Sequence, residues 1–128
     1  MSKVRTTAIA LAAVATGLLG TAPAAHADES GTSGGITVTA RGSGGHVTNT
    51  YVTVSSLSPF LSFTGFYKVY GPDYSSVSPT KEWGTSRIWN VQVGRDYAAG
   101  QQHCAEAWAE RDGGRFELIG RPCVENPI

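Results

Sequence analysis

The sequence predicts an all-β protein, an antiparallel β-sandwich of about seven strands with one disulfide. Apolar and polar residues alternate with a period of two in short runs, and clusters of Gly, Pro, Ser and Asp separate the runs at intervals of about ten residues. No run after residue 27 keeps a convincing helical period. The only two cysteines, Cys104 and Cys123, fall in neighbouring expected strands.

The expected strands extend from residue 36 to residue 125. The first alternates Ile36, Val38 and Ala40 with threonines, and alternation of the same period recurs in later runs. Residues 104–110 are rich in Ala and Glu, a composition that favours helix, but the strand-like runs around them favour a strand. The runs are residues 36–40, 46–54, 60–70, 80–83, 87–93, 101–110 and 115–125.

The last two strands can be paired residue by residue. If Gly113–Gly114 is the centre of the turn, opposed residues have numbers that sum to 227, and Cys104 then faces Cys123. The same register places Glu106 opposite Arg121, which is a favourable cross-strand charge pair. The other opposed pairs are Trp108 with Ile119 and Glu110 with Glu117.

The first 27 residues have the composition of a secretion signal. Two basic residues precede an apolar run from Ala8 to Leu19, and small residues lead to Ala27. The run is shorter than the approximately 20 residues that span a bilayer. We therefore expect a signal peptide over residues 1–27 and release without a membrane anchor. The mature chain should have a flexible tail over residues 28–35 and a single domain over residues 36–128.

Charge and cysteine content restrict the function classes. Without residues 1–27 the chain has eight basic and ten acidic residues, so a near-neutral, slightly acidic domain has no net positive charge to attract nucleic acid or anionic lipid. In an oxidising compartment the two cysteines should form one disulfide. Such a bond closes a loop of roughly 20 residues and contributes about 3 kcal/mol in the chain-entropy model. It also leaves no cysteine to act as a nucleophile.

No catalytic or metal-binding set emerges from the residues alone. Only His46 and His103 follow the signal, fewer than the three or four ligands of a zinc site. Gly31–Gly35 matches the G-x-S-x-G pattern, but it lies in the expected tail, without the strand and helix that position such a serine. Glu106 and Glu110 would lie about 13 Å apart on one strand, beyond the separations in glycosidases. We expect no catalytic residue, metal or cofactor.

The aromatic residues are the remaining candidates for binding. All three Trp and all five Tyr lie between residues 51 and 108. Tyr67, Tyr70 and Tyr74 cluster around an expected turn, and Trp83 is close in sequence. An exposed aromatic set suits sugar rings or a partner protein, whereas the alternative places most of these side chains in the core.

Two resemblances accompany these patterns. Positions within residues 65–125 resemble a pattern in small secreted proteins of high-GC Gram-positive bacteria, which implies secretion and no established activity. Residues 96–99 before Cys104 are similar to the approach to the second cysteine of immunoglobulin domains, although Gln102 and Cys123 depart from that pattern. The positions of the first pattern are Gly71, Pro72, Ser78, Pro79, Trp83, Cys104, Trp108, Gly120 and Cys123.

The sequence thus predicts a secreted, non-enzymatic interaction or binding module whose partner is an extracellular protein or glycan. Inhibition of a secreted hydrolase is one form of this function. A carbohydrate-binding module is the alternative, and a small secreted hydrolase is the third reading. Coplanar aromatics on an exposed sheet face would indicate the carbohydrate module, a projecting loop would indicate an inhibitor, and a histidine near a serine and an acid would indicate the hydrolase.

Overall fold

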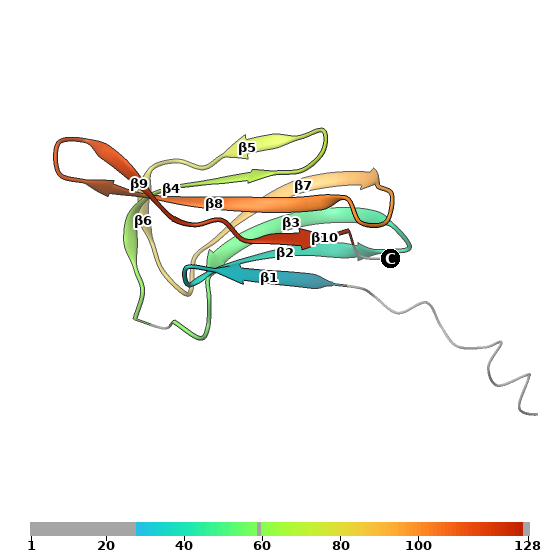
Figure 1. Ribbon diagram of the computed structural model, residues 1–128, viewed down its shortest axis with the longest axis horizontal. Helices are drawn as coiled ribbons and strands as arrows, with labels where there is room; N and C mark the ends of the chain where they lie inside the picture. Colours follow the sequence, from blue (N-terminus) through green and yellow to red (C-terminus); the bar gives the residue numbers. More distant parts are fainter. Residues whose placement is uncertain (1–27, 59, 127–128) are drawn as a thin grey trace, which may run out of the picture.

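The computed structural model describes residues 28–58 and 60–126, and their regular structure is entirely β-strand. Ten strands form two antiparallel sheets that pack as a sandwich (Figure 1). The described residues contain no helix able to cross a membrane. The expected signal peptide, residues 1–27, lies outside the described residues. The strands are β1 (Glu29–Ser33), β2 (Ile36–Ser43), β3 (His46–Val54), β4 (Phe63–Tyr70), β5 (Ser75–Val77), β6 (Lys81–Trp83), β7 (Ile88–Asp96), β8 (Gln102–Arg111), β9 (Arg115–Gly120) and β10 (Cys123–Glu125).

Sheet A has the strand order β1-β2-β3-β7. Its first two hairpins turn at Gly34–Gly35 and Gly44–Gly45, and all four glycines have positive φ. A two-residue turn with positive φ at both central positions matches the right-handed twist of the strands that it joins, and glycine adopts it without steric cost.

Sheet B has the order β10-β8-β4-β5, and its two central strands each have two partners along one edge. The first part of β4 pairs with β6 and its last part with β5. In the same way, the first part of β8 pairs with β10 and its later part with β9. The β8–β9 hairpin projects beyond the rest of the sandwich (Figure 1).

The core lies between the two sheets. Sheet A contributes mainly aliphatic side chains, whereas β8 contributes three buried alanines. The rings of Tyr67 and Trp83 pack with centroids 4.9 Å apart, and the Trp83 indole donates a hydrogen bond to the carbonyl of Gly65. Large rings thus pack beside small alanines in one layer. The buried aliphatic and alanine residues include Ile36, Val38, Ala40, Val52, Val54, Val69, Ala105, Ala107 and Ala109.

The all-β antiparallel fold and the disulfide are confirmed. The seven expected strands are all present, and residues 104–110 lie within β8 as a strand. Three strands are additional, namely β1, β5 and β10. The last arises because the expected strand over residues 115–125 is interrupted at residues 121 and 122, where Pro122 has no N–H to donate to a ladder.

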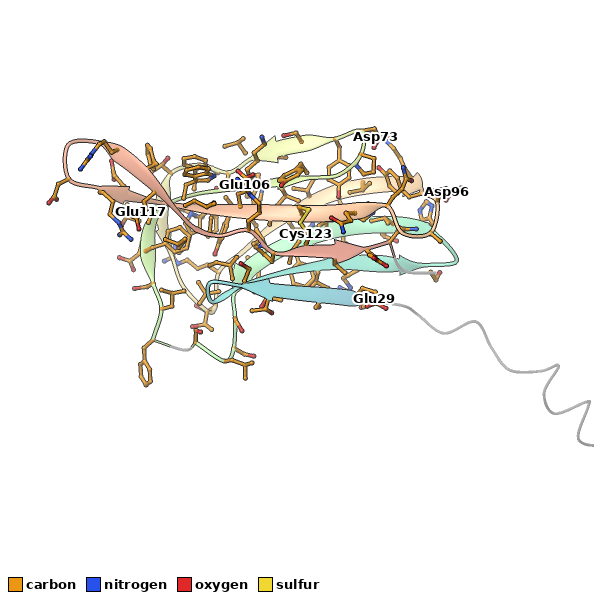
Figure 2. The ribbon with its side chains drawn as sticks, viewed as in Figure 1. Glu29, Asp73, Asp96, Glu106, Glu117 and Cys123 are labelled. Carbon is orange, nitrogen blue, oxygen red and sulfur yellow. A yellow bond between two sulfur atoms is a disulfide. The ribbon has the colours of Figure 1, made fainter. Side chains whose placement is uncertain are left out.

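The disulfide joins neighbouring strands of one sheet. Cys104 of β8 faces Cys123 of β10 in the register, as the sequence predicts (Figure 2). Arg121 forms the expected ion pair with Glu106, at 3.2 Å. The disulfide of immunoglobulin domains links the two sheets instead, so the similarity around Cys104 does not extend to the disulfide.

Nearer the turn, the predicted register is wrong by one residue. The loop holds three residues, Asp112–Gly114, because Arg111 pairs with Arg115. Trp108 therefore faces Leu118, and the pairing shifts between Ala107 and Trp108. Because of this β-bulge, the predicted pairing is correct between the bulge and the cysteines and wrong between the bulge and the turn. The expected opposition of Glu110 and Glu117 is also wrong, because Glu110 faces Phe116.

The predicted flexible tail is wrong for residues 29–33, which form β1 against β2. The backbone of β1 also lies very close to sheet B. A Cβ added to Gly31 would lie 2.1 Å from the carbonyl oxygen of Cys123, and one added to Gly120 would lie 2.3 Å from the carbonyl oxygen of Ser33. The absence of these Cβ atoms lets β1 close one side of the sandwich.

We predict that Gly31→Ala lowers the free energy of unfolding by about 1–3 kcal/mol, because backbone must move to admit the new methyl group. Gly84→Ala is the matched control, since its nearest contact would be an ordinary 3.9 Å to Ser62; it should change stability by no more than about 0.5 kcal/mol. Urea titration followed by tryptophan fluorescence measures both. Equal stabilities for the two variants would contradict the close packing of β1.

Candidate functional site

The four aromatic residues proposed for binding lie in different environments. Tyr67 is 0% exposed and Trp83 is 1% exposed, so both belong to the core and the prediction that they bind a ligand is wrong. The odd-numbered positions of β4 point inward, and Tyr67 is one of them. Tyr70, at an even position, is half-buried on the outer face of sheet B, and Tyr74 is half-buried at one end of the sandwich.

Tyr74 belongs to a buried polar network. Its hydroxyl lies 3.0 Å from Oγ1 of Thr50 and 2.8 Å from Nδ1 of His103. His103 is fully buried, and the ring of Tyr97 packs edge-on against it with centroids 4.9 Å apart. Burial lowers the pKa of His103, while Asn126 and the charge of Asp73 act more weakly in the opposite direction. The imidazole is therefore neutral in the folded protein at neutral pH.

An exposed charged cluster covers this end of the sandwich. The Tyr97 hydroxyl donates a hydrogen bond to Asp73 at 2.6 Å, and Arg95 forms an ion pair with the same carboxylate at 3.1 Å. The hydrogen bond from Tyr97 is the largest influence that lowers the pKa of Asp73. Burial, followed by the interaction with Asp73, raises the pKa of Tyr97 to about 12. These contacts connect the β4–β5 turn to β7 and the chain that follows it.

The outer face of sheet B carries a cluster that we call the aromatic patch, formed by Phe66, Trp108, Phe116 and Leu118. Phe66 faces Trp108 across β4 and β8, and their rings are nearly parallel, with centroids 6.4 Å apart and an interplanar angle of 15°. Phe116 packs edge-on against Phe66 at 5.0 Å and is 40% exposed. Leu118 faces Trp108 from β9. All four lie outside the core cluster.

A charged row borders the aromatic patch. Glu106 accepts a hydrogen bond from the Trp108 indole at 2.9 Å and pairs with Arg121, and its side chain is only 13% exposed (Figure 2). Lys68, opposite Glu106 in the register, lies 5.4 Å from the centroid of the Tyr70 ring. Burial and the carboxylate of Glu106 raise the pKa of Tyr70. The orientation of the Trp108 ring is thus fixed by a charged partner.

The outer face of sheet A differs in character, and we call it the neutral face. The registers of the four strands arrange its side chains in rows across the sheet. All of them except Ile88 and Arg41 carry a hydroxyl or an amide group. The rows are Thr32, Thr37, Thr53 and Ile88; then Ser30, Thr39, Tyr51 and Asn90; then Arg41, Asn49 and Gln92.

Two shallow hollows adjoin each other on the neutral face. The larger, of about 610 Å³, is lined by residues of β2, β3 and β7, including Tyr51, Asn90 and Gln92. The smaller, of about 350 Å³, lies toward the start of β1 and the end of β2. Arg41 and the adjacent pair Thr48–Asn49 line both hollows.

A histidine–acid pair lies at the end of the neutral face. Nδ1 of His46 is 2.6 Å from Oδ1 of Asp96, and Ser43 is the cross-strand partner of His46. This order of residue types resembles a serine hydrolase triad. However, no hydrogen bond joins the side chains of Ser43 and His46 in the described part of the chain. The His46 and Asp96 side chains are 47% and 85% exposed, as in a surface ion pair.

Among residues 28–58 and 60–126, no group of three or more His, Cys, Asp or Glu side chains could hold a metal ion. No family model matches the chain, and no curated protein or solved structure matches it. The function must therefore be inferred from the chemistry of the two outer faces.

Sequence reasoning missed the aromatic patch, although a signal was present. Lys68 and Thr64 share the even-numbered face of β4 with Phe66, and a lysine marks a face that points to solvent. The neutral face was missed because its side chains come from four strands, which form rows only when the strands pair in the observed register.

We predict opposite effects when two buried tyrosine hydroxyls are removed. The Tyr67 hydroxyl is buried and has no hydrogen-bond partner in the part of the chain that the structure describes, so Tyr67→Phe should leave stability unchanged or raise it. Tyr74→Phe removes the hydroxyl between Thr50 and His103 and should cost about 1–2 kcal/mol. The two substitutions delete the same atom and are mutual controls in a urea titration. A larger loss from Tyr67→Phe would show that its hydroxyl has a favourable interaction.

Stability should depend on the protonation of His103. The folded-state pKa lies below the ordinary histidine value of 6.5, so below about pH 6.5 the unfolded chain binds a proton that the folded protein does not. The free energy of unfolding should therefore fall as the pH decreases below 6.5 until the folded-state pKa of His103 is passed. NMR titration of the His103 imidazole measures that pKa directly, and a value at or above 6.5 would refute the prediction.

Proposed function

We propose that this chain is a secreted, non-enzymatic interaction module that binds an extracellular partner protein through the aromatic patch. The observation that carries the proposal is the cluster of Phe66, Trp108 and Phe116 on the solvent side of sheet B, outside the core. Tryptophan and aromatic side chains bordered by polar groups dominate the binding energy of many protein interfaces.

The composition of this face supports the proposal. In an antiparallel sheet with one solvated face, polar side chains ordinarily fill the outer positions. Here Phe66, Trp108 and Leu118 occupy a row of three neighbouring strands, and their apolar surface has no role in the core. The hydrogen bond from Trp108 to Glu106 holds the indole before a partner arrives, which reduces the entropy lost on binding.

The projecting β8–β9 hairpin favours a hydrolase as the partner. It extends beyond the sandwich (Figure 1), and Arg111 forms an ion pair with Glu117 across it at 3.6 Å. Phe116 lies on this hairpin, where it lines a hollow of about 240 Å³ together with Arg111, Arg115 and Glu117. A two-stranded projection with an aromatic side chain can enter an active-site cleft, so inhibition of a secreted hydrolase is the specific form that we propose.

Two features support secretion as part of this proposal. Residues 1–27 have the charge and hydropathy pattern of a signal peptide. The disulfide between Cys104 and Cys123 is compatible with an oxidising extracellular environment.

Phe116→Ser should weaken partner binding at least tenfold, because it removes the most exposed ring of the aromatic patch. Ile88→Ser is the matched control: Ile88 is 55% exposed and lies on the opposite sheet. The chain beginning at Asp28 is immobilised and exposed to culture fluid of the producing organism, and the retained proteins are quantified by mass spectrometry.

A partner retained by the wild-type chain and by Ile88→Ser, but lost with Phe116→Ser, would support the aromatic patch. If nothing is retained, or if all three chains retain the same proteins equally, the proposal is wrong. Hydrolytic activity of the retained partner is then assayed with and without the module. Undiminished activity of a captured hydrolase would exclude inhibition while leaving the binding surface established.

A further inference from the structure

The neutral face has the chemistry of a ligand site that is separate from the aromatic patch. Exposed protein surface ordinarily mixes acidic and basic side chains, and the outer face of sheet B has this character at Lys68, Glu106 and Arg121. The rows of the neutral face carry one charged side chain, Arg41. It pairs at 3.3 Å with Asp28, which also lines the smaller hollow. Among the described residues that line the two hollows, the only charged side chains are thus paired with each other, and a charged ligand would have to compete with that ion pair.

The backbone irregularities of sheet A coincide with the two hollows. The β2–β3 register shifts between Arg41 and Gly42, and the β3–β7 register shifts between Val47 and Asn49. Arg41, Gly42 and Asn49 also line the hollows. β-Bulges bend a sheet locally and redirect side chains, and they occur often beside binding sites. The otherwise regular sheet is thus hollowed at the place where its amide groups gather.

The amide groups retain hydrogen-bonding capacity. Asn49 donates from Nδ2 to Oδ1 of Asn90 at 2.6 Å, which orients both amides. The carbonyl oxygen of Asn49 and the amino group of Asn90 are then left to accept and to donate toward solvent. Gln92 lies next to Asn49 in the register and is exposed, and the ring of Tyr51 is half-buried beside Asn90.

We propose that the neutral face binds a neutral oligosaccharide. A sugar hydroxyl both donates and accepts hydrogen bonds, as do the paired amides, and the ring of Tyr51 offers apolar surface to the carbon-bound hydrogens of a sugar ring. The joined hollows cross three strands, which suits a chain of sugar units better than a single one. The site is open, as a polysaccharide with continuing ends requires.

Isothermal titration of the chain beginning at Asp28 with cellohexaose, chitohexaose and xylohexaose tests the proposal, with hexagalacturonate as the anionic comparison. At least one neutral hexasaccharide should bind. Tyr51→Ala should weaken this binding at least tenfold, Gln92→Ala should weaken it severalfold, and Tyr51→Phe should retain most of it because the ring remains. Phe116→Ser, on the opposite sheet, should leave it unchanged.

Chemical-shift mapping of the unsubstituted protein provides a test that does not depend on a variant folding. Addition of the bound hexasaccharide should perturb amide signals around Asn49, Tyr51 and Asn90 and leave those around Trp108 unchanged. Absence of binding to every neutral probe at millimolar concentration would overturn the proposal. So would equal or tighter binding of hexagalacturonate, or perturbations centred on the aromatic patch. Phe116→Ser changes only the aromatic patch, so the two proposals are tested separately. If the neutral face binds no oligosaccharide, the proposed protein binding at the aromatic patch can still be tested, and the reverse also holds.

Discussion

The disulfide between Cys104 and Cys123 joins β8 to β10 and fixes the register of these two strands. That register matters because the side chains of β8 alternate between the core and the outer face of sheet B. On one side His103 and three alanines face the core; on the other side lie Cys104, Glu106 and Trp108. A slip of one residue would exchange these two sets, burying a carboxylate and exposing the alanines. The covalent bond opposes this slip, so the core and the aromatic patch depend on the same register.

The two outer faces of the sandwich are chemically unlike. Sheet B presents rings next to a row of alternating charges, in which Glu106 contacts both Trp108 and Arg121. Sheet A presents hydroxyl and amide groups, with its backbone bulged where they gather around Asn49. Since the core lies between the sheets, a partner protein on one face and a glycan on the other would not compete for space. A module with both functions could hold a protein beside a polysaccharide.

The end of the sandwich near His103 concentrates polar groups inside the fold. The hydroxyl of Tyr74 bonds Nδ1 of His103 and is itself bonded to the hydroxyl of Thr50. Nε2 of His103 and Oδ1 of Asn126 are buried and have no hydrogen-bond partner among the described residues. An apolar residue at His103 would avoid that cost but would abandon the hydrogen bond to Tyr74. The network therefore positions the β4–β5 turn and makes this end of the molecule sensitive to acid.

Local alternation in the sequence determined the strands. The spacing of Cys104 and Cys123 predicted that they face each other, but this count assumed a two-residue turn. The loop has three residues, and the bulge between Ala107 and Trp108 restores the predicted pairing on the side of the cysteines. The repeated Ser-Gly-Gly at residues 33–35 and 43–45 even contained the signal for β1. Tertiary structure decided the rest. Alternation defines two faces of a strand but not which one the opposing sheet covers, so Tyr67 and Trp83 became core while Phe66 and Phe116 remained outside. The neutral face likewise required four strands in register, a relation between distant segments that no local pattern records.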